Sequence, residues 1–422
     1  MKKTTIGLAL AVTASLTLAG CSAASTPPAG DVSGDITYGI WDPNQQPAVD
    51  SMIEAFNEEY PDVTVTTTVT PFGQYWTTLQ TQASSNTLPD VFWMNMPYFK
   101  LYASNGQLAP IDDQVSAGDI DISAYPEALT AFYNYDGTQY AVPKDVDTDA
   151  MWLNTAVFEQ AGVELPSTDW TYDDYREIAG EITAALTSQG VFGTAFYPFG
   201  QTTYYNSVFA NGGSVISDDG TSSGWDSAGS REGLKIWADL IADGSAPTIP
   251  QLTDTSADAW FTSGKAAMFP SIAGASIGLL ANDPNMSQYV AFPLPQGDEG
   301  PATVGHSLSN VVSAKSANLP AAQAFQTFLA SKDAQLIQSE SGVALSAFAG
   351  TSDAFAASYP SLDLQVFVDA IDYSYPFPAS INTDAWQAGE PLIVGQYFAG
   401  AITLDEAIDQ LTTAMNEALA AE

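Results

Sequence analysis

Side chains that could hold a polar ligand gather in a loop that follows a strand-like stretch. Residues 35–40 alternate apolar and polar side chains, as a strand does, and Trp41, Asp42 and Gln45 come directly after them. Ligands of open α/β sheets bind outside the carboxyl ends of the strands. Carboxylate and carboxamide groups exchange hydrogen bonds with a polar ligand, and an indole offers it a flat apolar face. The loop therefore predicts a binding site.

Two carboxylates could also perform acid–base chemistry, and Asp42 and Asp147 are the pair to suspect. A secreted glycosidase or lyase would use such a pair, but nothing in the sequence marks one as the acid and the other as the base. The chain has one histidine, His306, and one cysteine, Cys21. Zinc sites and nucleophilic triads need more of these residues. We therefore expect a protein that binds no metal and no cofactor and that is not an enzyme.

The charge balance restricts the class of ligand. The 422 residues include 49 acidic and 10 basic ones. Nucleic-acid binding needs clustered lysine and arginine, so it is not expected. The chain also lacks a GxGxxG motif at the start of a helix and a GxxxxGK[ST] motif, so nucleotide binding has no support. A neutral or cationic ligand suits this surface better than an anion.

The beginning of the chain has the pattern of a secretory signal. A basic start, an apolar run over 6–18 and small residues after it predict a signal peptide over 1–20. The motif LAGC, which ends at Cys21, resembles the bacterial lipobox, in which the cysteine becomes the lipid-bearing first residue. Residues 21–34 are rich in Ser, Ala, Gly and Pro and predict a flexible, lipid-anchored tether. We expect an extracytoplasmic protein anchored to the cell membrane.

The periodicity after the tether alternates between the two regular structures. Strand and helix patterns succeed one another over the first hundred residues, which predicts an α/β lobe with a largely parallel sheet. The chain is long enough for two such lobes. Further helices are expected later, and Thr403 with Glu406 forms a capping box for the last of them. The predicted strands are 35–40, 62–69 and 89–95, and the predicted helices include 47–60, 72–86, 171–186, 230–244 and 403–422.

Several stretches, taken in order, carry a family resemblance over nearly the whole length after the leader. They include GIWDPNQQPAVDSMIEAFNEEYPDVTV, LPDVFWMN, NGQLAPIDD, YAVPKDVDTDAMWLNTAVFEQAGVELP, GKAAMFPSIAG and AAQAFQTFLAS. With the lipobox, the chain resembles the extracellular solute-binding lipoproteins of bacterial ABC importers. Within them it resembles the sugar- and oligosaccharide-binding group, family 1, which is like maltose-binding protein.

The resemblance implies a two-lobed, type II periplasmic-binding-protein-like α/β fold. Each lobe would be a mostly parallel sheet flanked by helices, with the ligand between the lobes and a hinge of crossing strands. The implied crossings lie near 144–147, 304–310 and 349–355. Lobe 1 would then comprise 35–146 plus 305–350, and lobe 2 would comprise 147–304 plus 351–422.

The resemblance also implies residues that contact a sugar, whose hydroxyls need hydrogen bonds and whose ring faces suit aromatic platforms. Trp41, Asp42, Gln45 and Asn95 are expected on the first lobe, and Asp147 is expected in the hinge as an acceptor for hydroxyls. Asp145 lies two residues earlier and could point the same way. The residues implied on the second lobe are Tyr204, Tyr205, Ser271, Gly274, Tyr375 and Trp386.

Some of these expectations carry an alternative. One of Tyr204 and Tyr205 is expected to pack in the core. Many relatives have a tryptophan just after the glycine that corresponds to Gly274, where this chain has Ala275. Either Tyr205 or Trp386 would replace that platform, or the ligand has another shape. A lone histidine such as His306 is usually structural.

The resemblance implies a monomeric binding component that delivers its ligand to the permease subunits of an importer. Three alternatives remain open. The same fold could bind a polyamine or another small cation, which the acidic surface favours. A glycosidase or lyase could use Asp42 and Asp147. The protein could also be an adhesin or a scaffold, with no permease.

Overall fold

The first of two four-stranded sheets holds the strands nearest the beginning of the chain. The computed structural model describes residues 32–422. Strand β1 is parallel to both β2 and β3, while β11 is antiparallel to β3. The carboxyl ends of β1 and β3 therefore lie side by side at one edge. The order is β11-β3-β1-β2, with β1 at Gly34–Ile40, β2 at Val63–Val69, β3 at Val91–Asn95 and β11 at Leu308–Val312.

The second sheet is mixed, and this corrects the expectation that each sheet is mostly parallel. Strand β6 is antiparallel to both of its neighbours, β8 and β9, and only β7 and β8 run parallel. The reason is that β6 is the strand by which the chain enters this lobe from the hinge. The order is β7-β8-β6-β9, with β6 at Asp149–Asn154, β7 at Phe192–Thr194, β8 at Ala266–Ile272 and β9 at Tyr289–Phe292.

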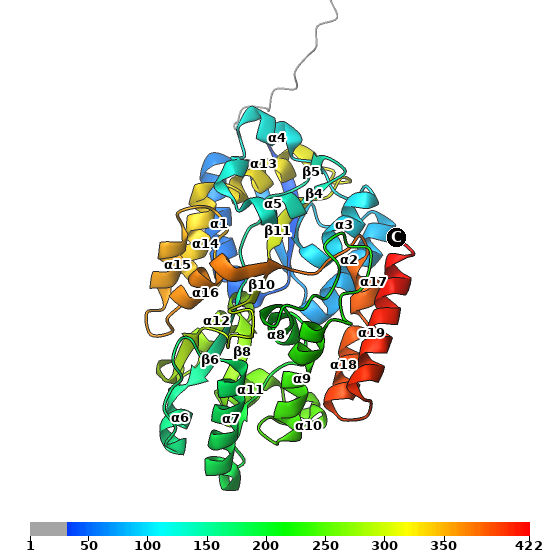
Figure 1. Cartoon of the computed structure of the whole chain (residues 1–422). Helices are drawn as coiled ribbons and strands as arrows, with labels where there is room; N and C mark the ends of the chain where they lie inside the picture. The colour runs from blue at the N-terminus through cyan, green and yellow to red at the C-terminus, as the bar shows by residue number, and fades with distance from the viewer. Residues whose placement is uncertain (1–31) are drawn as a thin grey trace, which may run out of the picture.

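Helices cover both sheets and form the two lobes seen in Figure 1, the upper around the first sheet and the lower around the second. The first lobe has α1 (Gln46–Glu59), α2 (Phe72–Ser85), α3 (Met96–Ser104), α4 (Asp112–Ala117), α5 (Glu127–Phe132), α13 (Leu319–Leu329), α14 (Lys332–Ser341) and α15 (Ser352–Ser358), the 3-10 turns η2 (Pro43–Gln45) and η3 (Ile122–Ala124), and the hairpin of β4 (Asn134–Tyr135) and β5 (Thr138–Gln139).

The second lobe contains the longest helix of the described chain, α19. Its elements are α6 (Thr155–Ala161), α7 (Tyr172–Leu186), η4 (Thr187–Gln189), α8 (Tyr204–Ala210), α9 (Ala228–Ala242), α10 (Ile249–Asp254), α11 (Ala257–Thr262), α12 (Ala273–Ala281), η5 (Met286–Gln288), α16 (Gln365–Asp369), η6 (Ala370–Tyr373), α17 (Thr383–Gln387), α18 (Glu390–Phe398) and α19 (Leu404–Leu419).

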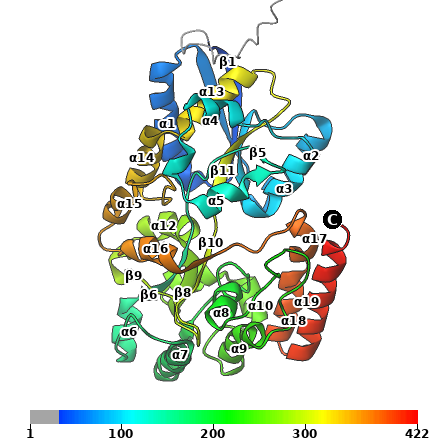
Figure 2. The ribbon, with the colours of Figure 1, turned by 45° about the horizontal axis from the view of Figure 1, so that its top comes forward.

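Three crossings join the lobes. Asp147 and His306 pair through both of their backbone groups, so the first two crossings run side by side. The third lies between Tyr359, whose hydroxyl reaches α14, and Leu362, whose carbonyl accepts from β9. The chain then runs across the middle of the molecule from α16 to α17 (Figures 1 and 2), where β12 (Ser374–Pro376) pairs with β10 (Thr303–Gly305).

Aromatic rings fill the core of each lobe. In the first lobe, the ring centre of Phe325 lies 5.3 Å from that of Tyr38 and 5.0 Å from that of Phe56. These contacts pack α13 and α1 against the sheet. In the second lobe, Trp237 of α9 meets Tyr175 of α7 at 6.0 Å. Burying rings of this size supplies much of the hydrophobic stabilisation. Both lobes therefore have a core of their own.

The predicted elements agree closely with the observed ones where the pattern is strong. The capping box is present, since Thr403 and Glu406 exchange hydrogen bonds at the start of α19. The predicted signal peptide, the anchor at Cys21 and most of the tether fall in residues 1–31, outside the described residues. Among residues 32–422, no helix combines the length and the apolar character that a membrane span requires.

Candidate functional site

An aromatic wall lines the strand ends of the first lobe. Trp41 follows β1 and lies 4.9 Å from Trp93 of β3 and 4.9 Å from Tyr75 of α2. The hydroxyl of Tyr75 donates to the carbonyls of Gly39 and Trp93, so one side chain pins α2 to both strand ends. Trp41 keeps part of its ring exposed, whereas Trp93 is fully buried. The wall thus presents Trp41 on a support of fixed rings.

The wall continues with two residues that the sequence analysis did not single out. Trp76 stacks on Tyr98 at 4.0 Å, with the rings 8° from parallel, and Trp41 lies 5.8 Å from Trp76. The hydroxyl of Tyr98 donates to Asp384 of α17 over 2.8 Å. Tyr98 lies on α3, and α17 packs against α3. The hydrogen bond therefore links the wall to the C-terminal helices of the second lobe.

The loop after β1 is a hydrogen-bonded turn that orients its carboxylate. Asp42 accepts from the backbone N–H of Asn44 at 2.9 Å and from the carboxamide of Gln45 at 3.3 Å. The proline at the start of η2 suits a first helical turn. Gln45 in turn accepts from the ammonium of Lys144 at 3.3 Å. The predicted residues Asp42 and Gln45 are therefore connected to the hinge.

Charged groups are concentrated in the first crossing. Lys144 and Asp145 form a buried ion pair of 2.7 Å, and the second oxygen of Asp145 accepts from the backbone N–H of Leu308. Asp147 accepts from the backbone N–H of Gly274 at 2.9 Å, at the first turn of α12. Asp147 therefore contacts both the crossing strands and the second lobe. The predicted pair Asp147 and Gly274 is brought together.

The surroundings of Asp147 change its acidity. The pKa of Asp147 is raised to about 7, because burial and the charges of Asp145 and Asp42 raise it more than the Gly274 N–H and the Lys144 ammonium lower it. The neighbouring His306 is also buried, and burial lowers its pKa to about 3, so the imidazole is neutral at physiological pH. The carboxyl of Asp147 thus titrates near neutrality.

Buried polar atoms without a protein partner occur on both lobes around the hinge. They include the carboxamide oxygen of Asn95, the indole nitrogen of Trp76, Nδ1 of His306 and the carboxamide nitrogen of Gln201. Each of these residues is at most 8% exposed. Such groups cost free energy when they are left unpaired, so natural proteins rarely bury them without a reason.

Three of these residues connect to the strands that meet at the hinge, and the fourth, Trp76, belongs to the aromatic wall. Asn95 ends β3 opposite Leu308, two residues after His306. The backbone carbonyl of Gln201 accepts from Asn206, whose oxygen accepts from Val304 at the hinge. A polar ligand that supplied donors to Asn95 and His306 and acceptors to Trp76 and Gln201 would satisfy them.

The second-lobe tyrosines have a packing role in this structure. Tyr204 and Tyr205 are fully buried, and their hydroxyls donate to the carboxylate of Glu390 at 2.7 and 3.0 Å. Gly200 lies against one face of the Tyr205 ring, where an added Cβ would come within 2.5 Å. One of the two tyrosines was expected to pack in the core, and in the structure both do. A stacking role for either stays a prediction.

The remaining predicted residues lie in different surroundings. Trp386 is 3% exposed, and its indole donates to Ser380 in the packing around α17. Tyr375 of β12 is 44% exposed and stacks on Phe209 at 4.8 Å. Ser271 is buried in β8, opposite Ala150. Their contact with a ligand stays a prediction, as does the effect of the missing tryptophan at the exposed Ala275.

Comparison with known structures shows the fold. An ABC substrate-binding protein of Listeria monocytogenes, solved in complex with cycloalternan, has a TM-score of 0.85 at 23% identity, over 92% of this chain and 100% of that one. The GacH receptor of Streptomyces glaucescens, solved without ligand and with acarbose, has a TM-score of 0.81 at 23% identity, over 92% and 99%. Both likenesses cover nearly the whole described chain and agree with the two-lobed, type II architecture.

The sequence comparisons identify the family. The diacetylchitobiose binding protein of Streptomyces coelicolor is 33% identical over 146 residues, which are 34% of this chain and 32% of that protein. Residues 42–336, well over half of the chain, match the family described as bacterial extracellular solute-binding protein. The aromatic wall, the hinge carboxylates and the two lobes thus belong to a chain that is a member of the bacterial extracellular solute-binding protein family.

Proposed function

We propose that this protein is the substrate-binding component of a bacterial ABC importer and that it binds a sugar or an oligosaccharide between its lobes. The observation that carries the proposal is the set of buried, unpartnered polar atoms of Asn95, Trp76, His306 and Gln201, together with the wall that presents Trp41. A glycan has hydroxyls that both donate and accept, and C–H faces that pack on indole. The cycloalternan, acarbose and diacetylchitobiose of the related proteins are ligands of this kind.

The protein would bind without changing its ligand. Asp42 already accepts two hydrogen bonds from its own turn, and Asp147 accepts one from Gly274. Each carboxylate keeps lone pairs that can accept ligand hydroxyls, and the family that the chain matches is one of binding proteins. The lobes touch in this structure, where α12 contacts η2 and Tyr98 bonds to Asp384. A ligand favours this arrangement only through contacts that are absent when the lobes are apart.

The remaining parts of the proposal concern location and partners. The leader pattern and the motif ending at Cys21 support secretion and a lipid anchor on the extracytoplasmic face of the cell membrane. The proposed partner is a pair of permease subunits that receive the loaded, monomeric protein. The lobe boundaries proposed from the sequence at 146–147 and 304–305 are part of the same proposal. The third boundary is proposed after α15, between Tyr359 and Leu362, and not at 350–351, because α15 packs on α14 of the first lobe.

Calorimetric titration of the protein lacking residues 1–31 against a panel of neutral oligosaccharides tests the proposal. We expect saturable binding of at least one of them. An assay for new reducing ends, run on the same samples, distinguishes binding from hydrolysis. Binding of a polyamine with no response to any glycan would contradict the proposal, and so would the release of reducing ends.

A further inference from the structure

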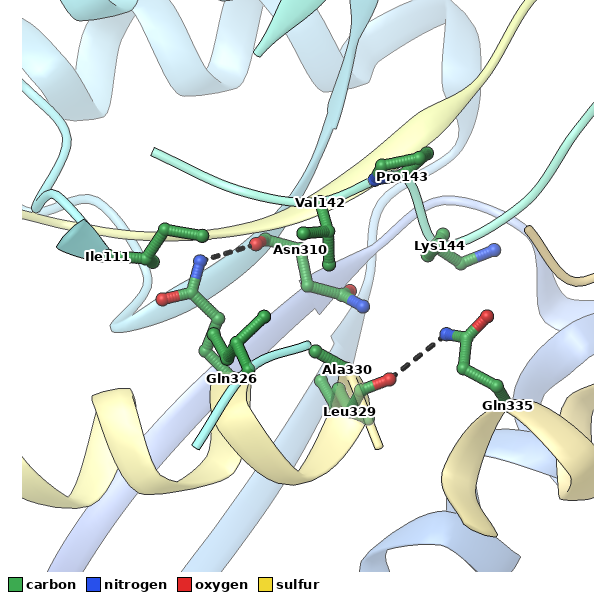
Figure 3. A pocket seen from close by; sticks show the side chains of 10 residues that line it. Ile111, Val142, Pro143, Lys144, Asn310, Gln326, Leu329, Ala330 and Gln335 are labelled. Atoms are coloured by element: carbon green, nitrogen blue, oxygen red, sulfur yellow. Dashed lines mark hydrogen bonds between the residues drawn. The ribbon is translucent and has the colours of Figure 1, made fainter. Parts of the chain in front are cut away.

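Lys144 is the one lysine or arginine that is buried among residues 32–422. Its side chain is 3% exposed and comes from the first crossing. Figure 3 shows it at one end of a small cavity of about 10 Å³ in the first lobe, with its ammonium directed away from Gln326 and Ile111. Burying an ammonium is costly unless its surroundings compensate. The surroundings of Lys144 therefore need an explanation.

Three groups surround the ammonium and together form a site for an organic cation. The nitrogen lies 4.6 Å from the ring centre of Trp93, 2.7 Å from a carboxylate oxygen of Asp145 and 3.3 Å from the carboxamide oxygen of Gln45. An aromatic face, a carboxylate and a neutral acceptor are what a protein uses to recognise an alkylammonium ligand. Here the chain fills that site with its own side chain.

Both sides of this site are held in place. The indole N–H of Trp93 donates to the hydroxyl of Tyr38 at 2.7 Å. The backbone of Lys144 donates to the carbonyl of Leu308 at 2.7 Å and accepts from the carboxamide of Gln338 at 2.8 Å. These bonds fix the Trp93 ring and the backbone from which the Lys144 side chain starts. The ammonium itself is held by its contacts with Asp145, Gln45 and the Trp93 face.

The ammonium also reaches the groups proposed to bind the glycan. Lys144 donates to Gln45, whose amide donates to Asp42 at 3.3 Å. Its charge favours the ionised form of Asp147. Removing it would free Gln45 to rotate and would leave Asp145 buried without its partner.

We propose that Lys144 is a specificity-determining and positioning residue: its ammonium occupies an organic-cation site on the first lobe, orients Gln45 and Asp42 for a neutral ligand, and excludes a cationic one. Only the statement about glycan binding rests on the proposed function. The cation site itself is defined by the contacts of the ammonium with Trp93, Asp145 and Gln45.

Chemical rescue tests the proposal. Lys144→Ala removes three carbons and the nitrogen, the atoms of n-propylammonium. We expect the variant, purified in the presence of that amine, to be stabilised by n-propylammonium and not by n-propanol or by sodium chloride at equal concentration. Thermal unfolding and tryptophan fluorescence report this without any sugar. Lys144→Met fills the space with an uncharged chain and should show no response to the amine, and neither should the exposed control Lys315→Ala.

The sugar part has its own readout. For a glycan that the wild-type protein binds, we expect Lys144→Met to weaken affinity by about tenfold or more, and Lys144→Ala to recover most of its loss when n-propylammonium is added. Equal stabilisation by n-propanol, or unchanged glycan affinity in both variants, would overturn the proposal. If the wild-type protein binds no glycan while the amine still stabilises Lys144→Ala, the proposed function fails and the cation site stands.

Discussion

Asn95 ends β3 with a carboxamide oxygen that is buried and has no protein partner. A ligand hydroxyl that donates to it would recover a penalty of roughly 1–3 kcal/mol. We therefore expect Asn95→Leu to weaken glycan binding by roughly 5- to 150-fold while the melting temperature stays equal or rises. Calorimetry and thermal unfolding measure the two effects. Asn105→Leu, on the exposed end of α3, is the matched control. A variant that binds normally would show that the oxygen does not face the ligand.

The acidity of Asp147 predicts a pH dependence of binding. Burial, with the charges of Asp145 and Asp42, raises its pKa to about 7 although Lys144 and the Gly274 N–H lower it. His306, with a pKa of about 3, does not titrate near neutrality. An ionised carboxylate accepts a hydroxyl better than a protonated carboxyl. Affinity should therefore fall as the pH drops below about 7, by at most about tenfold per pH unit.

Asp147→Asn separates this effect from other titrations. The carboxamide still accepts from the N–H of Gly274 but carries no proton that titrates in this range. We expect weaker binding that no longer varies between pH 6 and pH 8. Calorimetry across that range in buffers of matched ionic strength is the measurement. A slope that persists in the variant would assign the titration to another group.

At the scale of the residue, the sequence located some groups at strand ends and missed Trp76 and Gln201. Asp42 and Gln45 follow a predicted strand, and the strand-end rule locates them, whereas Asn95 was implied by the family resemblance. Trp76 lies within an amphipathic helix, where periodicity shows that a face is buried but not against what. Gln201 precedes α8 in a loop without regular structure, so no pattern marks it. The role of both depends on neighbours that are distant in sequence, Trp41 and Tyr98 for Trp76 and the hinge for Gln201, and a local pattern does not contain them.

At the scale of the element, a buried carboxyl joins α18 to α8. Glu390 accepts from Tyr204 and Tyr205, and burial raises its pKa to about 7 although the two hydroxyls lower it. The folded state thus keeps a proton that the unfolded chain releases above about pH 4.5. This group's contribution to the free energy of unfolding falls as the pH rises from about 4.5 to about 7, by roughly 3–4 kcal/mol in total.

Glu390→Gln should remove that loss, because glutamine does not titrate. Relative to the wild type, we expect the variant to gain stability from pH 5 to pH 8, as measured by thermal or urea unfolding. The comparison within one pH cancels His306, whose lowered pKa acts in the opposite direction below its unfolded pKa. A difference between the two proteins that stays constant with pH would contradict this assignment.

The boundaries of helices and strands were predictable where one periodic pattern dominates. The pairing and direction of the strands were not. The strand over 35–40 and the helix over 72–86 appear as β1 (Gly34–Ile40) and α2 (Phe72–Ser85). The antiparallel setting of β6 escaped prediction, because the direction of that strand follows from a crossing that joins distant parts of the chain. The burial of Glu390, far in sequence from its tyrosines, is non-local in the same way.

At the scale of the whole molecule, the two lobes meet where Gly278 packs against Asn44, and the space there admits no side chain larger than the hydrogen of glycine. Gly278 of α12 is buried, and a Cβ added there would come within 2.9 Å of the Cβ of Asn44 in η2. A larger residue must therefore move α12 away from η2. Because closure is proposed to trap the ligand, such a change should favour the open arrangement of the lobes.

Gly278→Leu is expected to lower glycan affinity and to increase the radius of gyration measured by small-angle X-ray scattering. Gly395→Leu, inside α18 where an added Cβ meets nothing within 4 Å, should leave both quantities unchanged. Gly278→Ala should give a smaller effect, and adding Asn44→Gly should reverse it, because that change removes the atom in conflict and keeps the backbone N–H that donates to Asp42. If the double variant remained open, the Gly278–Asn44 contact would not be what limits closure, and the lobes would have to be held apart elsewhere.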